Sequence, residues 1–228
     1  NKTLTLTKDD KVPGAGILTQ HCSDGATFPL RDAVRLMIVY SDNTATNMVL
    51  DQIGIKSVNE TTKALGLAET RVNAKVFKGS TTSVDPERTK KYGLGSTTAN
   101  EMASLLEMIH AGKLGAPEST KAMLDHLKAN DDKDSLVRDL PAGTVVAHKT
   151  GAVTAVRTDA GVVFAQDDGS VWFTDGGQPR RIAEQTCAGT SPTNVEGLVT
   201  GDGPWAAWFD CTPAHQGDLV VFDTNFGQ

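Results

Sequence analysis

The sequence has few cysteines, and they follow no recognisable pattern. Cys22, Cys187 and Cys211 are far apart, and none belongs to a Cys-x-x-Cys pair or a Cys/His cluster. An odd number of cysteines without such spacing argues against both a disulfide framework and a zinc site. We therefore expect isolated thiols that behave as small buried apolar side chains.

Long apolar runs and an excess of positive charge are also missing. The longest apolar stretches, such as residues 36–40, are far too short to span a bilayer. The chain has 22 Lys and Arg against 28 Asp and Glu, for a formal net charge of -6. Nucleic acids and anionic membrane surfaces attract basic proteins, so neither partner is expected. The 39% of hydrophobic residues is ordinary for a soluble globular protein.

The first two thirds of the chain carry helical periodicity. Apolar residues recur every three or four positions, and glycines follow several of these segments. Thr98 and Glu101 have the spacing of a capping box at the start of one helix. The expected helices cover residues 30–38, 46–53, 57–65, 98–111 and 117–127. Residues 70–97 predict a long polar loop between the third helix and the fourth.

After residue 143 the pattern becomes that of strands. Short β-branched or aromatic runs cover residues 144–148, 161–165 and 170–174, and Asp168-Gly169 predicts a hairpin turn between the last two. Helices followed by strands indicate an α+β fold, with a helical lobe followed by part of an antiparallel sheet. Residues 176–228 give no clear order of elements. We therefore expect one domain over residues 1–175 and an unassigned C-terminal tail over residues 176–228.

Two short motifs have side chains suited to catalysis. Ser41-Asp42-Asn43 lies where one helical pattern gives way to the next, and Lys149-Thr150-Gly151 lies at the end of a predicted strand. Taken singly, Ser41 could cap a helix, Asn43 could bond its own backbone, and Lys149 could be a solvated strand-end lysine. In this order, about a hundred residues apart, they match two of the three signatures of class A β-lactamases and penicillin-binding proteins.

The chain resembles the class A β-lactamase superfamily, in particular its serine hydrolase branch. The resemblance covers roughly residues 1–175 and is carried by residues 36–54, 92–98 and 147–161. It implies an incomplete β-lactamase/transpeptidase-like fold and a serine hydrolase that opens β-lactams through an acyl-enzyme, without metal or other cofactor. One alternative is a penicillin-binding or peptidoglycan-directed relative without efficient deacylation, or a non-catalytic binding relative. Another is a helical protein in which the motif pair is coincidental.

The resemblance also implies a role for each residue of the two motifs. Ser41 would relay a proton to the lactam nitrogen, and Lys149 would keep Ser41 polarised and supply positive potential. Apart from the resemblance, we interpret Asp42 as a residue that orients the structure and His148 as a packing or hydrogen-bonding residue, neither of which reacts. The substrate would be bound by the amide of Asn43, the hydroxyl of Thr150, close approach at Gly151, the backbone N–H of Ala152 in an oxyanion hole, and Arg157 as a further carboxylate anchor.

Two parts of the family's pattern are missing from the sequence. No serine is followed three residues later by lysine, and no Gly-x-Ser-x-Gly is present, so we expect the nucleophile upstream and no acyl-enzyme from this chain alone. Val76 stands where the family's loop carries a water-activating glutamate, and valine cannot be a general base. Glu87 is a possible replacement, or it is only a solvated loop acid. The resemblance further implies a periplasmic or secreted monomer acting on a small-molecule β-lactam or a peptidoglycan-like substrate.

Overall fold

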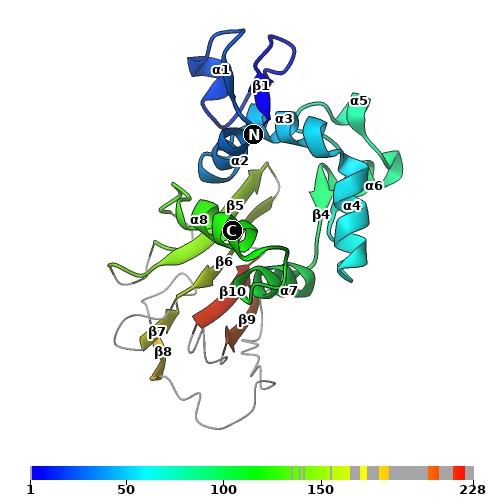
Figure 1. Cartoon of the computed structure of the whole chain (residues 1–228). Helices are drawn as coiled ribbons and strands as arrows, with labels where there is room; N and C mark the ends of the chain where they lie inside the picture. Colours follow the sequence, from blue (N-terminus) through cyan, green and yellow to red (C-terminus); the bar gives the residue numbers. More distant parts are fainter. Residues whose placement is uncertain are drawn as a thin grey trace. The chain divides into compact units, whose positions relative to one another are not determined.

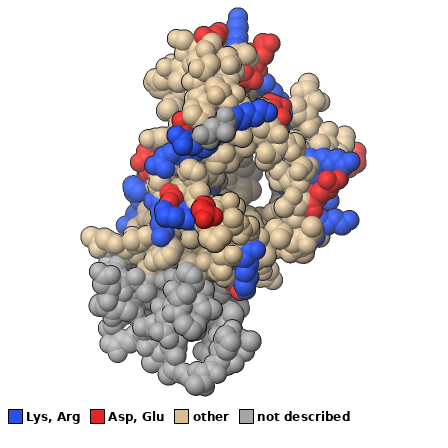
Figure 2. Space-filling model, in the orientation of Figure 1, with Lys and Arg blue, Asp and Glu red and all other residues tan. Residues whose placement is uncertain are grey.

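The computed structural model describes residues 2–134, 136–138, 140, 142–154 and 156–164, together with the backbone of four later strands. The chain divides into two compact units, Asn1–Glu101 and Met102–Gln228. Within the described residues, no helix has the length and apolar character needed to cross a bilayer. On the face shown in Figure 2, side chains of both charge signs are scattered over the described surface.

The first unit is built on a pair of packed helices. Its elements are β1 (Thr3–Thr5), α1 (Leu18–His21), β2 (Thr27–Pro29), α2 (Leu30–Val39), α3 (Asn43–Ile53) and α4 (Ile55–Ala64) (Figure 1). Helices α2 and α3 pack against each other, and β1 pairs antiparallel with β2. The core contains Leu4, Leu6, Leu18, Ala33, Ala45, Met48 and Val49, whereas the apolar Ile53 at the end of α3 is 48% exposed. The three helices predicted in this region are therefore confirmed, with shifted ends.

The segment expected as one long polar loop contains short elements instead. They are β3 (Arg71–Val72), α5 (Gly79–Thr82), α6 (Pro86–Tyr92) and β4 (Gly95–Ser96), and β3 pairs with β4. Helix α6 begins with Pro86 at its first position, and Asp85 caps it by accepting a hydrogen bond from the Arg88 N–H at 2.9 Å. Periodicity did not reveal these elements because each is too short to show a repeat.

Helix α7 (Ala99–His110) starts as predicted, but only half of the expected capping box forms. The Glu101 N–H donates to Thr98 Oγ1 at 3.2 Å, which confirms the cap. The Glu101 carboxylate does not return to Thr98 and instead accepts from the Glu69 N–H at 3.0 Å and the Thr70 hydroxyl at 2.6 Å. Glu101 therefore ties the start of α7 to the chain just before β3.

The second unit places a helix against an antiparallel sheet. Helix α8 (Pro117–Lys128) packs on β5 (Figure 1). The sheet has the strand order β5-β6-β10-β9, formed by Val146–Val153, Val156–Val163, Asp218–Asp223 and Trp205–Asp210. All its pairs are antiparallel, so the helix-then-sheet order of the α+β prediction is confirmed.

The hairpin predicted from residues 161–165 and 170–174 is wrong. Strand β6 pairs with β5 and β10, whereas β7 (Ser170–Phe173) pairs with β8 (Arg180–Glu184). The polar start of β6 hid its true beginning, because its first residues are exposed and only its last five are buried. The Asp168-Gly169 turn lies outside the described residues. The sheet continues past residue 175, so the expected division there does not coincide with the division between the two units.

Candidate active site

The Ser41-Asp42-Asn43 motif forms the turn between α2 and α3, and a buried carboxylate holds it. Asp42 is 1% exposed, and its side chain accepts hydrogen bonds from the backbone N–H groups of Ala45 at 2.8 Å, Ile17 at 2.7 Å and Leu18 at 2.9 Å. These donors lie at the starts of α3 and α1, where helical N–H groups otherwise lack partners. Asp42 is the N-cap of α3, so the orienting role predicted for it is confirmed and the helix-cap alternative for Ser41 is wrong.

Ser41 adopts a backbone conformation that is uncommon outside glycine. Its φ is +50°, in the left-handed region, and the residue is half-buried. Such a conformation costs on the order of 1–3 kcal/mol and persists only where the surroundings impose it. The constraint comes from the flanking residue, because the Asp42 N–H donates back to Leu36 O at 3.2 Å while its carboxylate is bound as described. The position of the hydroxyl-bearing residue is therefore determined by the turn.

Asn43 is bound to a glycine-containing loop at residues 13–16. Its side-chain Nδ2 donates to Pro13 O at 3.0 Å, and its backbone N–H donates to Ala15 O at 3.1 Å. A Cβ on Gly16, whose φ is +110°, would lie 2.3 Å from the Asp42 side chain. The loop approaches the motif this closely because glycine has no Cβ. In the sequence, the glycines of Pro13-Gly14-Ala15-Gly16 are the signal that this loop could approach another segment closely.

Val76, which we expect at the position of the family's glutamate, is bound to α3 through its backbone. Asn47, 2% exposed, donates from Nδ2 to Val76 O and accepts from the Val76 N–H, both at 2.9 Å. The neighbouring Lys75 forms an ion pair with Asp51 on the same helix. Asn47 lies one helical turn after the motif, and the sequence reasoning did not identify it. The backbone at Val76 is therefore held in place, while its side chain has no acid or base.

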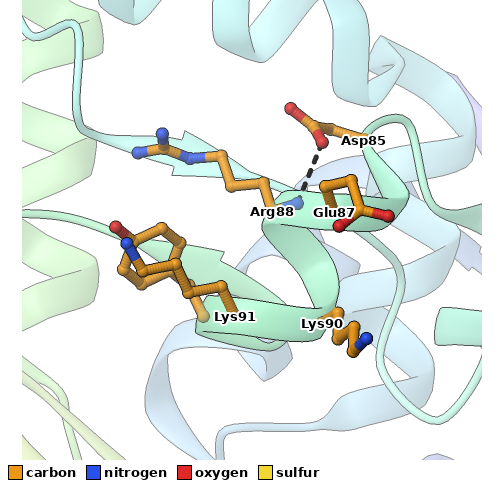
Figure 3. Close-up of a pocket in the computed structure, with 6 residues that line it drawn as sticks. Asp85, Glu87, Arg88, Lys90 and Lys91 are labelled. Atoms are coloured by element: carbon orange, nitrogen blue, oxygen red, sulfur yellow. Dashed lines mark hydrogen bonds between the residues drawn. The ribbon is translucent and has the colours of Figure 1, made fainter.

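Glu87, the possible loop acid, lies on α6 in a shallow surface pocket. The pocket has a volume of about 540 Å³ and is lined by Asp85, Glu87, Arg88, Lys90, Lys91 and Tyr92. Figure 3 shows the Glu87 carboxylate on the opposite side of α6 from the Arg88 side chain. Glu87 is exposed to solvent. A catalytic role for Glu87 stays a prediction.

The second motif lies along β5, which pairs only with β6 among the strands the structure describes. Opposite residues in an antiparallel pair share a face, and residues two apart along one strand do as well. Thr150 is opposite Asp159, and Ala152 is opposite Arg157. Thr150 and Arg157, the two predicted carboxylate anchors, therefore belong to one face of this sheet, with the Arg157 side chain exposed.

Gly151 and Lys149 share the other face of β5. A Cβ on Gly151 would lie 2.8 Å from Thr158 Oγ1, so the bare backbone fits close beside β6. Lys149 is half-buried, and its Nζ donates to Thr150 O at 2.6 Å. Burial lowers the pKa of the Lys149 ammonium, and the carboxylates of Asp159 and Asp132 partly offset this effect. The alternative of a freely solvated strand-end lysine is therefore wrong.

A buried pair fixes the start of β5 immediately before Lys149. His148 and Asp159 are each 2% exposed, and His148 Nδ1 lies 3.0 Å from both carboxylate oxygens. Asp159 also accepts the Leu136 N–H at 2.9 Å, and Asn130 Nδ2 donates to His148 O at 3.0 Å. The packing and hydrogen-bonding role predicted for His148 is confirmed. No group of three or more metal-ligating side chains occurs in the part of the chain that the structure describes.

The sequence profile of the beta-lactamase enzyme family matches residues 1–191, most of the chain. The chain belongs to this family. Within it, the chain is 29% identical over 167 residues to a beta-lactamase of Bacillus licheniformis, covering 72% of this chain and 52% of that protein. It is 28% identical over 167 residues to beta-lactamase 3 of Bacillus cereus, again covering 72% of this chain and 50% of that protein. The chain thus spans about half the length of the curated relatives it matches.

Solved structures of the beta-lactamase family share the fold. A beta-lactamase from Sphaerobacter thermophilus superposes with a TM-score of 0.61 and 30% identity, covering 71% of this chain and 59% of that one. A PBP-A variant, solved as an acyl-enzyme complex with penicillin G, superposes with a TM-score of 0.60 and 30% identity. The superposition covers 78% of this chain and 60% of that one. These neighbours include both a beta-lactamase and a penicillin-bound protein, so the likeness applies to both functional alternatives.

The two beta-lactamase motifs lie in different units of this chain. Ser41 and Asn43 belong to Asn1–Glu101, whereas Lys149, Thr150 and Ala152 belong to Met102–Gln228. Each half is organised by its own buried carboxylate, Asp42 in one unit and Asp159 in the other. That the halves meet in a single cleft stays a prediction.

Proposed function

We propose that this protein is a serine hydrolase that opens β-lactams through an acyl-enzyme, and that residues 1–228 supply its proton relay and substrate anchors. The observation that carries this proposal is the Ser41–Asn43 turn. A carboxylate with three backbone donors holds it, and Ser41 keeps a costly left-handed conformation in a member of the beta-lactamase family. Strain of this kind concentrates at functional sites.

In the proposed reaction, the hydroxyl oxygen of a serine upstream of this chain bonds to the lactam carbonyl carbon, and the ring carbon–nitrogen bond breaks. Ser41 donates its hydroxyl proton to the departing nitrogen, and the proton lost by the nucleophile replaces it through the relay. The Lys149 ammonium polarises Ser41 and stabilises negative charge. This role fits a lysine that is half-buried, where charge acts more strongly than in water.

The remaining residues of the two motifs bind the substrate in this proposal. The Ala152 N–H, on the strand edge away from β6, donates to the developing oxyanion. Thr150 and Arg157, on one face of the sheet, bind the substrate carboxylate. Asn43 binds the substrate amide through the part of its side chain that does not bind Pro13.

Val76 favours the form of this function in which the acyl-enzyme is long-lived. Release of the acyl group needs a base to activate water, and the residue whose backbone Asn47 holds at this position has an apolar side chain. Membership of the beta-lactamase family makes efficient β-lactam turnover the first candidate. Val76 is the observation that favours the second candidate, a penicillin-binding or peptidoglycan-directed enzyme. Either activity acts on substrates found outside the cytoplasm, so we place the protein in the periplasm or secreted fraction.

The full-length gene product distinguishes the two candidates. We expect a penicillin probe to add one acyl mass to the full-length protein and none to residues 1–228 alone. Ser41→Ala should slow acylation by about 10²- to 10⁴-fold, the usual contribution of a positioned proton donor. Catalytic turnover of nitrocefin would support the first candidate, and a single stoichiometric burst the second. An adduct on residues 1–228 alone would contradict the upstream location of the nucleophile.

Introducing the missing base tests the role of position 76. Val76→Glu keeps the backbone hydrogen bonds to Asn47 and adds a carboxylate, so we expect deacylation of the full-length protein to accelerate by about 10²-fold or more. Val76→Gln, of similar shape without a basic group, is the matched control and should not accelerate it. Equal rates in the two variants, measured by loss of the acyl mass, would show that position 76 does not govern deacylation.

A further inference from the structure

Phe77 combines two features that are costly together. Its φ is +55°, and among the described residues only Ser41 shares such a conformation outside glycine. For a bulky aromatic residue this is a genuine outlier. Its side chain is also 63% exposed, so the strain is not offset by burial in the core of its own unit.

Both strained residues are close to Asn43, one along the chain and one in space. Ser41 is two residues before Asn43 in the chain, and Phe77 reaches Asn43 through space at Gly14. A Cβ built on Gly14 would lie 2.4 Å from Asn43 Nδ2 and 3.1 Å from Phe77 Cε2. The Asn43 amide and the Phe77 ring are therefore neighbours above this glycine, and any larger residue at position 14 would separate them.

The position of the ring is imposed by its attachments. Val76, the preceding residue, is bound to Asn47 through both its N–H and its C=O. Lys78, the following residue, donates from Nζ to Asp9 O at 2.6 Å. With both flanks bound to other segments, Phe77 has little freedom to leave the left-handed region, and its ring is presented to solvent beside Asn43.

We propose that Phe77 is a specificity-determining residue, which contacts an aromatic or aliphatic group carried by the amide that Asn43 binds. This inference rests on the proposed function, in which Asn43 binds a substrate amide. Asn43 donates one Nδ2 hydrogen to Pro13, which leaves a second hydrogen and Oδ1 to pair with a secondary amide. A group attached to that amide would lie against the ring.

The charges around Phe77 favour an uncharged group. The neighbouring lysines are both engaged, Lys75 with the Asp51 carboxylate and Lys78 with the Asp9 carbonyl. The ammonium groups of both lysines are bound to these other partners, and an exposed ring favours apolar and aromatic contact. The ligand class is therefore an N-acyl compound with an arylalkyl or alkyl side group.

Two amide fragments test this contact without any covalent step. N-phenylacetylglycine carries the aromatic group and N-acetylglycine lacks it, and both are titrated into the isotope-labelled full-length protein by NMR. We expect the phenylacetyl compound to bind about fivefold more tightly, the usual size of one aromatic contact, and to shift the Asn43 side-chain amide and Phe77 signals. Phe77→Ala should abolish this preference. Tyr92→Ala, which removes another exposed aromatic side chain from residues 70–97, should retain it.

Stability measurements separate a ligand contact from a structural one. Phe77→Gly removes the strain at φ +55°, so its thermal midpoint should equal or exceed that of the wild type while the phenylacetyl preference is lost. A lowered midpoint in both Phe77→Gly and Phe77→Ala would show that the ring packs on another part of the protein, which overturns the proposal. Equal binding of the two fragments to the wild type, or binding of neither, overturns it as well.

Acylation by two β-lactams, compared with fragment binding, shows whether the inference on Phe77 or the proposed function has failed. If benzylpenicillin and 6-aminopenicillanic acid acylate the full-length protein with equal efficiency, the proposed function stands and the inference on Phe77 fails. If no β-lactam reacts but the phenylacetyl fragment is preferred in a Phe77-dependent way, the inference stands and the proposed function fails.

Discussion

Asp42 shows how one buried side chain can organise a reactive turn without reacting. Its carboxylate binds backbone donors from α3 and from the start of α1, and Gly16 packs against its side chain. The same turn positions Ser41 before it and Asn43 after it. The conformation of both proposed functional residues therefore depends on a neighbour that is almost inaccessible to solvent.

Replacing Asp42 should destabilise the first unit. Asp42→Ala leaves three N–H groups without their acceptor, so we expect the free energy of unfolding to fall by about 2–4 kcal/mol in urea titrations. Asp32→Ala is the matched control, because Asp32 is a half-exposed acid in the first turn of α2 and its loss should cost less than about 1 kcal/mol. Similar decreases in the free energy of unfolding in both variants would show that the three hydrogen bonds to Asp42 do not stabilise the first unit.

Lys149 gives the protein a defined response to alkaline pH. Burial lowers the pKa of its ammonium despite the opposing carboxylates of Asp159 and Asp132, so the charge is lost below the usual range for lysine. We expect acylation of the full-length protein to decline as pH rises through this lowered value. The unfolded chain binds the proton more tightly than the folded one, so this group makes the free energy of unfolding increase with pH between the two pKa values.

Removing the ammonium tests both effects together. Lys149→Met should slow acylation by about 10²-fold or more and should abolish this contribution to the pH dependence of unfolding. Lys121→Met, on the exposed face of α8, should leave both unchanged. An alkaline decline of acylation that survives in Lys149→Met would assign the titration to another group.

At the scale of elements, β5 and β6 leave no room for a side chain at Gly161, which is opposite His148. A Cβ on Gly161 would lie 2.5 Å from His148 Cβ and 2.7 Å from Ala147 O. Because backbone atoms cannot move aside cheaply, Gly161→Ala should lower the free energy of unfolding by about 2–3 kcal/mol. Gly79→Ala, where the nearest atom is 4.0 Å away, should change it by less than about 1 kcal/mol in the same titration. A neutral Gly161→Ala would show that the two strands separate readily.

The elements that the sequence predicted well have long, regular apolar patterns. Helices α2, α7 and α8 fall in this group. The strand that carries Lys149 does not, because the short run at residues 144–148 predicts only part of Val146–Val153. The pairing of β6 with β10 could not be predicted, because residues far apart in the chain form it and β6 begins with exposed polar residues. Within the site, the motifs were visible as sequence. The Asn47–Val76 bonds and the Phe77 contact depend on how the chain folds back on itself, which no local pattern records.

At the scale of the whole molecule, the proposed function needs the two units to bring their motifs together. Spin labels at Tyr40 and Val153 flank the two motifs on exposed positions, with the three native cysteines replaced by serine. We expect double electron–electron resonance on the full-length protein to give one short, narrow distribution of distances between the two labels. The distance distribution for a second pair of labels, at Tyr92 and Val153, is compared with that of the first pair. A long or broad distribution for the first pair would place Ser41 and Lys149 in separate regions and remove the basis of the proposed mechanism.

The position of β10 between β6 and β9 has a consequence for biosynthesis. Residues 164–217 must leave the ribosome before β6 can acquire its second partner, so the strand next to the lysine-bearing one emerges with an open edge. Unpaired edges of this kind recruit other chains. A nascent polypeptide interrupted in that interval would be exposed to misassembly, and holdase chaperones would find their binding surface there.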